Sequence, residues 1–384
     1  MLKKDRVINQ FTRDPVDYLP SQITFSDRTR YKEISEALEL DDVSQLDDYL
    51  ENHIEFTFVL DDVPLFFRSN ASVMAELEKK GYVRVNKEEN TVYDRWGMGI
   101  LTSGEGYFTN YGCLAGIEAK NNIARPFLPE SITRLWDMSF EQAVEAYEAP
   151  DPMSEDNLEW LERDKNGVKG DLCAIPSGYV GVFERAYSLL GFQTFMTEIA
   201  ANPKMIYGLL EKITDYRMKL VKPKADMGYK IIHQGDDLAT QCGGFFSDKM
   251  FKEILFPHYK RLFEECKKYD LYIMMHSCGH MVHYLPDLIS IGLDAWEPVQ
   301  PCNDLKFVKR EYGKDLVFMG GIDTQTLPFK TPEQVTEMTR EAIEVLGKGG
   351  GYIIAPSQEL MNDVPLENVV AMLKTAVYLR DKVI

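Results

Sequence analysis

The segment LYIMMHSCGHMVHYLPDLISIGLDAWEPVQ, residues 271–300, decides the fold class of this chain. It holds two apolar, strand-like runs with a helical pattern between them, which is the signature of a βαβ unit. The same alternation of strand and helix continues on both sides of the segment, and such repeats predict a parallel sheet. The predicted strands are Tyr229–His233, Leu271–Met275, Leu293–Trp296, Leu316–Met319 and Gly351–Ala355.

Three potential metal ligands follow the two strands of this segment. Because a strand alternates its side chains with period 2, His276 and Cys278 emerge on one side, and the next strand can bring Glu297 beside them. Imidazole, thiolate and carboxylate are all zinc donors, and three protein ligands without a fourth are typical of a catalytic zinc. The alternative is a chance His-x-Cys, in which the cysteine is only a small buried hydrophobe.

Each of the five predicted strands ends in polar residues. In a (β/α)8 barrel the chemistry lies at the carboxyl ends of the strands, so these residues are candidates for one site. Besides the three potential zinc ligands, the polar residues at these ends are Asp236, Asp237, Gln300, Asp323, Ser357 and Gln358. We select Asp236, Asp237 and Gln358 as candidate catalytic residues, although strand-end carboxylates can instead cap helices or orient substrate.

Residues typical of helix starts and ends occur throughout the second half of the chain. Helical periodicity predicts helices after Asn202 and after Thr331, the latter with Pro332 at its first position and Gln334 as a capping-box partner. The glycines at 347–351 indicate the end of that helix, and Pro257 should break the helix predicted over 247–269. Residues 147–167 read as a solvated excursion. With no convincing linker, residues 1–384 are expected to form a single domain.

Composition restricts the partners of the protein. The chain has 61 acidic and 43 basic residues and a net charge of −18, which disfavours nucleic acid and anionic membranes as partners. No apolar run approaches the roughly 18 residues that span a bilayer. The first residues lack the apolar core of a secretion signal, and six dispersed cysteines suit a reducing compartment, so we expect a cytoplasmic protein.

Several motifs together resemble the uroporphyrinogen decarboxylase superfamily, in particular its MtaA/CmuA-like branch of corrinoid-dependent methyltransferases. RVINQFTRDPVDYLP (6–20) is similar to the amino-terminal segment of that superfamily. Three further segments are similar to its strand-end pattern: HSCGHMVHYLPDLISIGLDAWEPVQP (276–301), YGKDLVFMGGIDTQTLPFKTPEQV (312–335) and GGGYIIAPSQELMNDVPLENVVAM (349–372). The resemblance implies one (β/α)8 TIM barrel, here with an N-terminal extension and an irregular insertion in the first half.

The resemblance also implies a zinc ion in the methyltransferase branch. The related cobalamin-independent methionine synthases use His-x-Cys, then Glu, then Cys on successive strands, and His276, Cys278 and Glu297 match the first three. The fourth ligand would fall near Ser357 and Gln358, where this chain has no cysteine. Water, substrate or the Gln358 oxygen could complete the site, or the metal could be lost.

Three functions follow from these expectations. The first is a methyltransferase with one zinc per chain, which moves a methyl group from a small donor such as a methyl ether to a corrinoid protein carrying cobalamin; a homodimer is also allowed for. The second is decarboxylation of a uroporphyrinogen, for which Arg28 and Arg30 are too few and differently spaced. The third is a metal-free binding barrel. Aromatic residues that could line the pocket, or belong to the core, are Tyr107, Phe108, Tyr111, Trp136, Tyr179 and Phe183.

Overall fold

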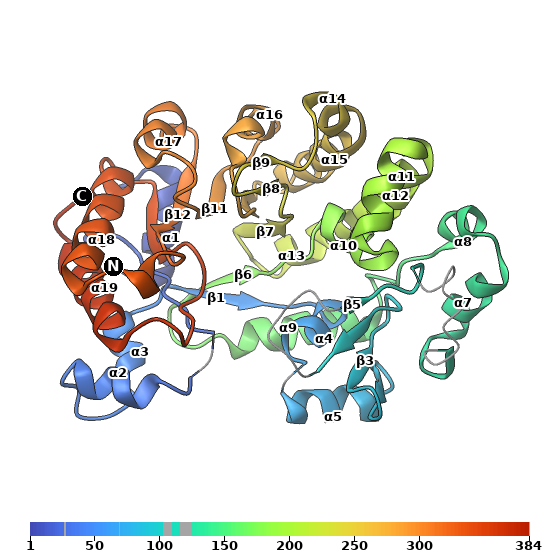
Figure 1. Cartoon of the computed structure of the whole chain (residues 1–384), viewed down its shortest axis with the longest axis horizontal. Helices are drawn as coiled ribbons and strands as arrows, with labels where there is room; N and C mark the ends of the chain where they lie inside the picture. Colours follow the sequence, from blue (N-terminus) through green and yellow to red (C-terminus); the bar gives the residue numbers. More distant parts are fainter. Residues whose placement is uncertain (27, 69, 103–109, 116–124, 384) are drawn as a thin grey trace.

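The chain folds into an α/β structure in which helices cover parallel strands (Figure 1). The computed structural model describes residues 1–26, 28–68, 70–102, 110–115 and 125–383, with the side chains of residues 110 and 111 left aside. Five strands form one parallel sheet in the order β13-β12-β11-β10-β7, and β1 and β6 form a second. Their bounds are β1 Ile54–Thr57, β6 Cys173–Pro176, β7 Ile231–Gly235, β10 Tyr272–His276, β11 Ala295–Val299, β12 Val317–Ile322 and β13 Tyr352–Pro356.

All five predicted strands of the second half are present. Each observed strand extends one to three residues further toward its carboxyl end than its apolar run. Polar residues are among those added, because His276 and Glu297 stay in the ladder and pair across β10 and β11. Hydrophobicity therefore located these strands but not their carboxyl ends, where His276 and Glu297 line the site.

The two parallel sheets enclose a common apolar interior. Ser21 forms parallel bridges to both Asn52 and Ile354, and the Gly178 carbonyl beyond β6 accepts a hydrogen bond of 2.5 Å from Gly235 at the end of β7. Where a ring of eight strands was predicted, the structure has two parallel sheets that these contacts link. Inward-facing residues of all seven strands pack together: Ile54, Cys173, Ile175, Ile231, Met274, Ala295, Val317, Met319, Ile353 and Ala355.

The amino-terminal helix lies at one end of this interior. Helix α1, Lys3–Thr12, contributes Val7 to the interior cluster, and its Phe11 ring lies 5.1 Å from the ring of Tyr272 at the start of β10. The amide of Lys4 donates to the carbonyl of Asp171, just before β6. The amino ends of the strands are therefore covered, and the carboxyl ends remain for a site.

Helices of the second half follow the expected pattern. The main ones are α10 Val182–Leu190, α11 Phe192–Ala201, α12 Pro203–Lys219, α13 Val221–Asp226, α16 Leu285–Ser290, α17 Leu305–Tyr312, α18 Pro332–Gly347 and α19 Leu366–Leu379. Thr331 and Gln334 form the predicted capping box of α18. Pro257 lies in the first turn of α15, Phe256–Lys267, which a π-helical turn at Phe251–Leu255 separates from α14, Asp248–Met250.

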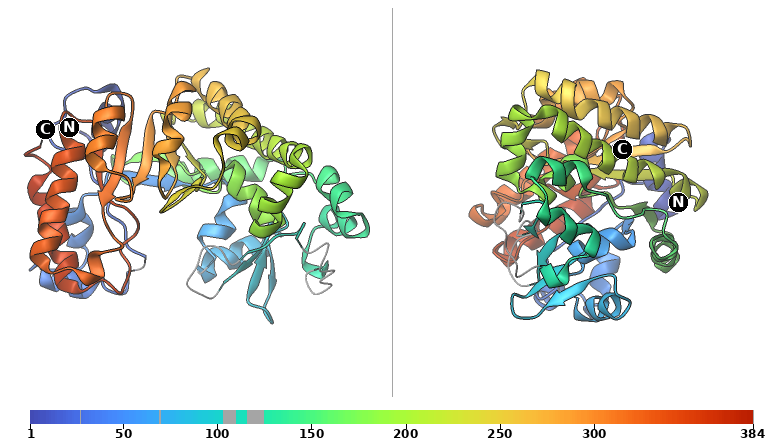
Figure 2. Two further views of the ribbon diagram at one scale, coloured as in Figure 1. Left: turned by 45° about the horizontal axis from the view of Figure 1, so that its top comes forward. Right: turned by 90° about the vertical axis from the view of Figure 1, so that its right-hand side faces the viewer.

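The first half of the chain forms smaller elements around the strands. The antiparallel strands β2 Arg84–Asn86, β3 Thr91–Tyr93, β4 Gly99–Leu101 and β5 Asn110–Tyr111 build a separate sheet, which Figure 2 shows at the opposite end of the molecule from α18 and α19. The short helices of this half are α2 Tyr31–Ala37, α3 Gln45–Leu50, α4 Val63–Phe66, α5 Ala71–Lys79, α7 Glu130–Thr133 and α8 Phe140–Ala146.

The prediction of a solvated excursion over residues 147–167 is wrong. Residues Glu155–Gly167 form helix α9, which buries Asn157, Trp160 and Leu161. These positions are spaced i, i+3 and i+4, so they form a narrow stripe on one face of the helix. The other positions of the helix are highly charged, so composition alone did not predict this buried stripe.

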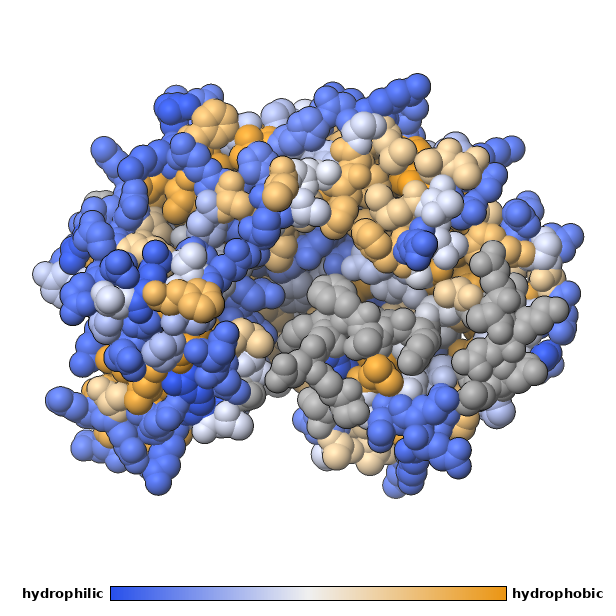
Figure 3. All heavy atoms as spheres, viewed as in Figure 1, coloured by the Kyte–Doolittle hydropathy of each residue, from blue (hydrophilic) through white to orange (hydrophobic). Residues whose placement is uncertain are grey.

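The surface agrees with the acidic composition. Figure 3 shows hydrophilic side chains around much of the rim of one face, with hydrophobic patches between them. Among the helices of the described residues, none combines the length and the apolar character that crossing a membrane requires.

Candidate functional site

A cavity of about 410 Å³ opens at the carboxyl ends of the strands. Five of the six predicted site residues line it: Asp237, His276, Cys278, Glu297 and Gln358. Parallel strands present their carboxyl ends at one edge, so residues far apart in sequence meet here. The exception is Asp236, which is buried and is not part of the cavity wall.

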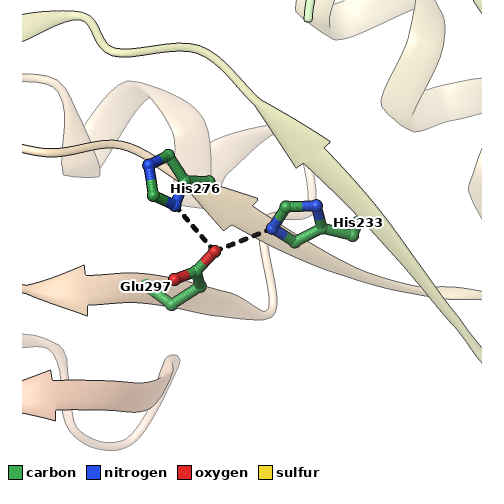
Figure 4. Close-up of side chains that lie close together, drawn as sticks. All are labelled: His233, His276 and Glu297. Carbon is green, nitrogen blue, oxygen red and sulfur yellow. Dashed lines mark hydrogen bonds and ion pairs between the residues drawn. The ribbon is translucent and has the colours of Figure 1, made fainter. Parts of the chain in front are cut away.

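His276 is the centre of this polar group. Its Nδ1 lies 2.8 Å from Glu297 Oε1, because the two residues are ladder partners on neighbouring strands (Figure 4). Its Nε2 points the other way, 3.5 Å from Asp237 Oδ1 and 3.7 Å from Cys278 Sγ. The backbone N–H of Cys278 donates to Asp237 Oδ1 at 2.7 Å, which holds the Asp237 carboxylate beside Cys278.

His233 completes the group and was missed in the sequence. Its Nε2 lies 2.8 Å from Glu297 Oε1, and the Gly178 backbone N–H donates to its Nδ1 at 3.3 Å (Figure 4). Nε2 therefore carries the proton that His233 donates to Glu297. A signal existed: alternation along β7 places His233 on the same face as Asp237, four residues later.

Burial and neighbouring charges shift the pKa values of these side chains. Burial lowers the pKa of His276, but the Glu297 carboxylate and Cys278 outweigh it and raise that pKa well above its usual value. Burial raises the pKa of Glu297, but His276 and His233 reverse this and lower it to about 2. Burial lowers the pKa of His233 and raises that of the Cys278 thiol. Without a metal, His276 and Glu297 therefore form a buried ion pair.

Two overlapping sets of side chains have the composition of a metal site. One set is Asp237, His276 and Cys278, and the other is His233, His276 and Glu297, with ligand atoms within 4.8 Å of one another in each set. A tetrahedral zinc with bonds of about 2.0–2.3 Å separates a nitrogen from a sulfur ligand by about 3.6 Å and from an oxygen ligand by about 3.4 Å. The observed separations around His276 Nε2, 3.7 and 3.5 Å, fit that geometry.

The structure places Glu297 on the other side of the imidazole. A 2.8 Å contact is a hydrogen bond and is too short for two ligands of one tetrahedral ion. A carboxylate that accepts from the far nitrogen of a ligating histidine fixes the ring and its tautomer. The donor set therefore fits zinc with Asp237 beside His276 and Cys278, and with Glu297 orienting the histidine.

Asp236 has a different position from its neighbour. Its carboxylate accepts the backbone N–H groups of Val182, Phe183 and Glu184 at 2.7–3.0 Å, and the Tyr259 hydroxyl at 2.6 Å. These amides are the first turn of α10, so Asp236 satisfies a helix amino terminus. Burial raises the pKa of Asp236 to about 6 against these donors.

Aromatic rings form one wall of the cavity. Of the predicted aromatic residues, Tyr179 lines it, whereas Trp136 and Phe183 are buried in the core. Tyr107 and Phe108, and the side chain of Tyr111, lie outside the described residues. The wall is built mainly by rings that the sequence reading did not select: Phe56, Phe58, Phe66, Phe67 and Tyr187.

The remaining charged groups of the wall are acidic. Glu184 of α10 and Glu359 line the cavity, and no lysine or arginine of the described residues does. Burial, then Asp237 and Asp236, raise the pKa of Glu184 well above its usual value. Arg30 instead pairs with Glu33, and the Arg28 guanidinium lies over the Tyr31 ring.

Known proteins resemble the chain in sequence and in fold. It is 24% identical over 188 residues to the chloroplastic uroporphyrinogen decarboxylase of Nicotiana tabacum, covering 47% of this chain and 44% of that protein. It is 23% identical over 184 residues to the uroporphyrinogen decarboxylase of Hordeum vulgare, covering 46% and 52%. The matches thus span about half the length of these relatives.

A solved structure described as a methyltransferase from Methanosarcina mazei matches the fold over 98% of both chains, with a TM-score of 0.57 and 15% identity. The family profile described as uroporphyrinogen decarboxylase (URO-D) matches residues 129–378, which is more than half of the chain and includes the potential zinc ligands. The chain therefore belongs to the uroporphyrinogen decarboxylase family.

Proposed function

We propose that this protein is a zinc-dependent methyltransferase, which moves a methyl group from a small donor such as a methyl ether to a corrinoid protein. We further infer that its two parallel sheets and the Ser21 segment correspond to a (β/α)8 barrel. The observation that carries the proposal is the set Asp237, His276 and Cys278 on the wall of a substrate-sized cavity. The fold match to a protein described as a methyltransferase supports it.

Different residues of the site would hold the metal and contact the substrate. Asp237, His276 and Cys278 would bind zinc and leave its fourth position open, while Glu297 and His233 fix the His276 ring. A bound zinc would supply a Lewis acid for the ether oxygen. Gln358, exposed at the mouth of the cavity, is placed to contact the substrate.

Methyl transfer from the ether to the corrinoid needs no further co-reactant. The bond between the methyl carbon and the ether oxygen breaks, and a bond between that carbon and cobalt(I) of the corrinoid forms. The electron pair of the broken bond stays on the oxygen, which takes up a proton from solvent. The aromatic wall around Tyr179 offers an apolar surface for the rest of the donor.

Decarboxylation of a uroporphyrinogen is the second candidate, because the sequence relatives carry that name. Such a substrate bears several carboxylates and calls for cationic groups around it. Among the described residues that line this cavity, the formal charges belong to Glu184, Asp237, Glu297 and Glu359, with His276 as the sole basic side chain. This charge pattern favours the methyltransferase.

The first test is the zinc content of anaerobically purified protein. We expect about one zinc per chain, with large losses in Cys278→Ala and Asp237→Ala. Cys302→Ala is the matched control, because Cys302 is partly exposed and is not on the cavity wall. The parent should also convert cob(I)alamin to methylcobalamin with a methyl ether, followed by absorbance. Absence of zinc after reconstitution contradicts the proposal, and decarboxylation of uroporphyrinogen would establish the second candidate.

A further inference from the structure

One wall of the cavity consists of aromatic rings and begins beside the proposed metal position. The centre of the Tyr179 ring lies 4.9 Å from that of His276, 5.4 Å from that of Phe56 and 5.8 Å from that of Phe66. Phe58 continues the wall, with its ring centre 4.9 Å from that of Phe66. All these rings line the cavity, so a ligand that extends from the metal position meets several ring surfaces.

Gln22 brings an amide group to the floor of the cavity. Met319 and Ala355 line the cavity and also belong to the apolar interior of the strands, so they mark its floor. Gln22 lines the cavity at the same level, because its backbone N–H donates to the carbonyl of Ile354, next to Ala355. The backbone N–H of Ile54 donates to Gln22 Oε1 at 3.1 Å and fixes the side chain.

The NH₂ group of this amide is available to a ligand. Because Oε1 accepts from a backbone N–H, the other terminal atom is the nitrogen, which carries two donor hydrogens. Among the residues that the structure describes, none accepts a hydrogen bond from Gln22 Nε2. A ligand that fills the cavity removes water from this group, so it should itself supply an acceptor.

The metal position and Gln22 lie on opposite sides of the interior. Ser21, beside Gln22, bridges to Ile354 in β13 and to Asn52 just before β1. Strand β1 pairs with β6, whose end is linked to β7. Between the Ser21 segment and β10, which carries His276, lie β1, β6 and β7 on one side and β13, β12 and β11 on the other. A ligand with its ether oxygen at the metal position therefore points its far end toward Gln22.

We propose that the methyl donor is an aromatic ring with oxygen substituents at opposite ends, the methyl ether at the metal position and a second oxygen that accepts from Gln22 Nε2. The inference rests on the proposed function; it names the substrate class of the same site and makes Gln22 a residue that determines specificity. The ring would pack on the wall of Tyr179, Phe56 and Phe66, because offset and edge-to-face contacts between rings add to the stability that buried area gives.

An aromatic donor also supplies a better leaving group. The bond between the methyl carbon and the ring oxygen breaks, and the carbon bonds to cobalt(I) of the corrinoid. The electron pair stays on the oxygen as a phenoxide, which takes up a proton from solvent. A phenol has a pKa of about 10, whereas the pKa of water is about 15.7 and simple alcohols resemble water, so phenoxide leaves more readily than alkoxide.

Calorimetric titration of metal-free protein with matched probes tests this proposal. The first pair is 1,4-dimethoxybenzene and 4-ethylanisole, which has a CH₂ group in place of the second oxygen; the diether should bind at least about fivefold more tightly. The second comparison is trans-1,4-dimethoxycyclohexane, which keeps both oxygens but not the aromatic ring and should bind at least about fivefold more weakly than the diether. Equal affinity in either comparison would overturn the proposal, and so would tighter binding of 1,2-dimethoxybenzene, whose oxygens are adjacent.

Variants assign the two preferences to residues. Gln22→Met keeps the length of the side chain without an N–H donor, so 1,4-dimethoxybenzene should lose its advantage over 4-ethylanisole. Gln325→Met is the matched control, because Gln325 is exposed and is not on the cavity wall. Phe66→Leu should reduce the preference for the benzene over the cyclohexane, and Phe329→Leu, at a residue that is 85% exposed, should not. An unchanged advantage of the diether in Gln22→Met would overturn the proposal. Should that variant not fold, the probes in the parent and in Phe66→Leu still decide.

The titrations keep this inference apart from the proposed function, because they need neither zinc nor turnover. A protein that binds one zinc and methylates cob(I)alamin, but does not distinguish the diether from 4-ethylanisole, retains the proposed function and loses this substrate class. A protein that shows both preferences but binds no zinc retains the aromatic site and loses the zinc mechanism.

Discussion

Asp236 and Asp237 are adjacent in sequence, and exchanging each for asparagine should affect different properties, stability at Asp236 and zinc affinity at Asp237. Asp236 Oδ2 accepts the amides of Val182 and Phe183 and the Tyr259 hydroxyl, and Oδ1 accepts the amide of Glu184. An asparagine keeps one acceptor oxygen, so in its best orientation its NH₂ group faces the Glu184 N–H. Asp237 instead accepts one backbone N–H, from Cys278, and its side chain is 27% exposed.

The magnitude follows from counting these bonds. One buried donor left without an acceptor costs about 1–3 kcal/mol, and three charge-assisted bonds reduced to neutral ones cost roughly 1 kcal/mol each. Asp236→Asn should therefore lower the free energy of unfolding by about 4–6 kcal/mol. Asp237→Asn keeps an oxygen for its single donor and should change stability by less than about 1 kcal/mol, while zinc affinity falls at least tenfold.

The assay is urea unfolding at pH 8, followed by circular dichroism, with a chelator present so that zinc binding does not add to stability. The pKa of Asp236 is raised to about 6, so its carboxylate is ionised under these conditions. An Asp236→Asn protein within about 1 kcal/mol of the parent would refute the capping role. A large loss in Asp237→Asn would refute the division of roles between the two residues.

Three more results are expected. Glu297→Gln should lower zinc affinity about 10–100-fold in competition with a chelating dye, because the carboxylate orients His276; unchanged affinity would contradict this. Thr331→Ala removes the cap of α18 and should cost about 1 kcal/mol in thermal unfolding. Burial raises the pKa of Asp94 to about 7, so the folded state holds a proton that the unfolded state has lost between about pH 4 and 7. Stability should therefore fall as pH rises across that range, and Asp94→Asn should flatten the fall in urea titrations.

Hydrophobic periodicity predicted the parallel sheet because buried strands and their covering helices repeat a local pattern. The same logic placed Asp237, His276, Cys278 and Glu297 on one cavity, since carboxyl ends of parallel strands share an edge. His233 was missed because only residues beyond each apolar run were considered. His233 lies two periods of the alternation before Asp237, so finding it required following the face of the strand as well as its end.

Contacts between residues far apart in the sequence could not be predicted from local patterns. Asp236 binds amides 52–54 residues away, so its capping role depends on where α10 packs. The phenylalanines at 56–67 lie in the first half of the chain, where no strand was predicted, and they were therefore not taken for a pocket wall. They reach the cavity because β1 ends there and α4 returns the chain to the same edge.

Arginines near this end of the molecule are already engaged elsewhere. Arg185 lies 2.7 Å from Asp62, Arg217 lies 3.4 Å from the same carboxylate, and Arg95 lies 3.3 Å from Asp61. These guanidinium groups are paired with the buried carboxylates of Asp61 and Asp62, and none of the three lines the cavity. A family fold places a site at the strand ends, but the sign of the charge on its wall selects the ligand. Here the arginines paired with Asp61 and Asp62 leave the described part of the wall without a guanidinium that could pair with a polycarboxylate, which favours the methyltransferase over the decarboxylase.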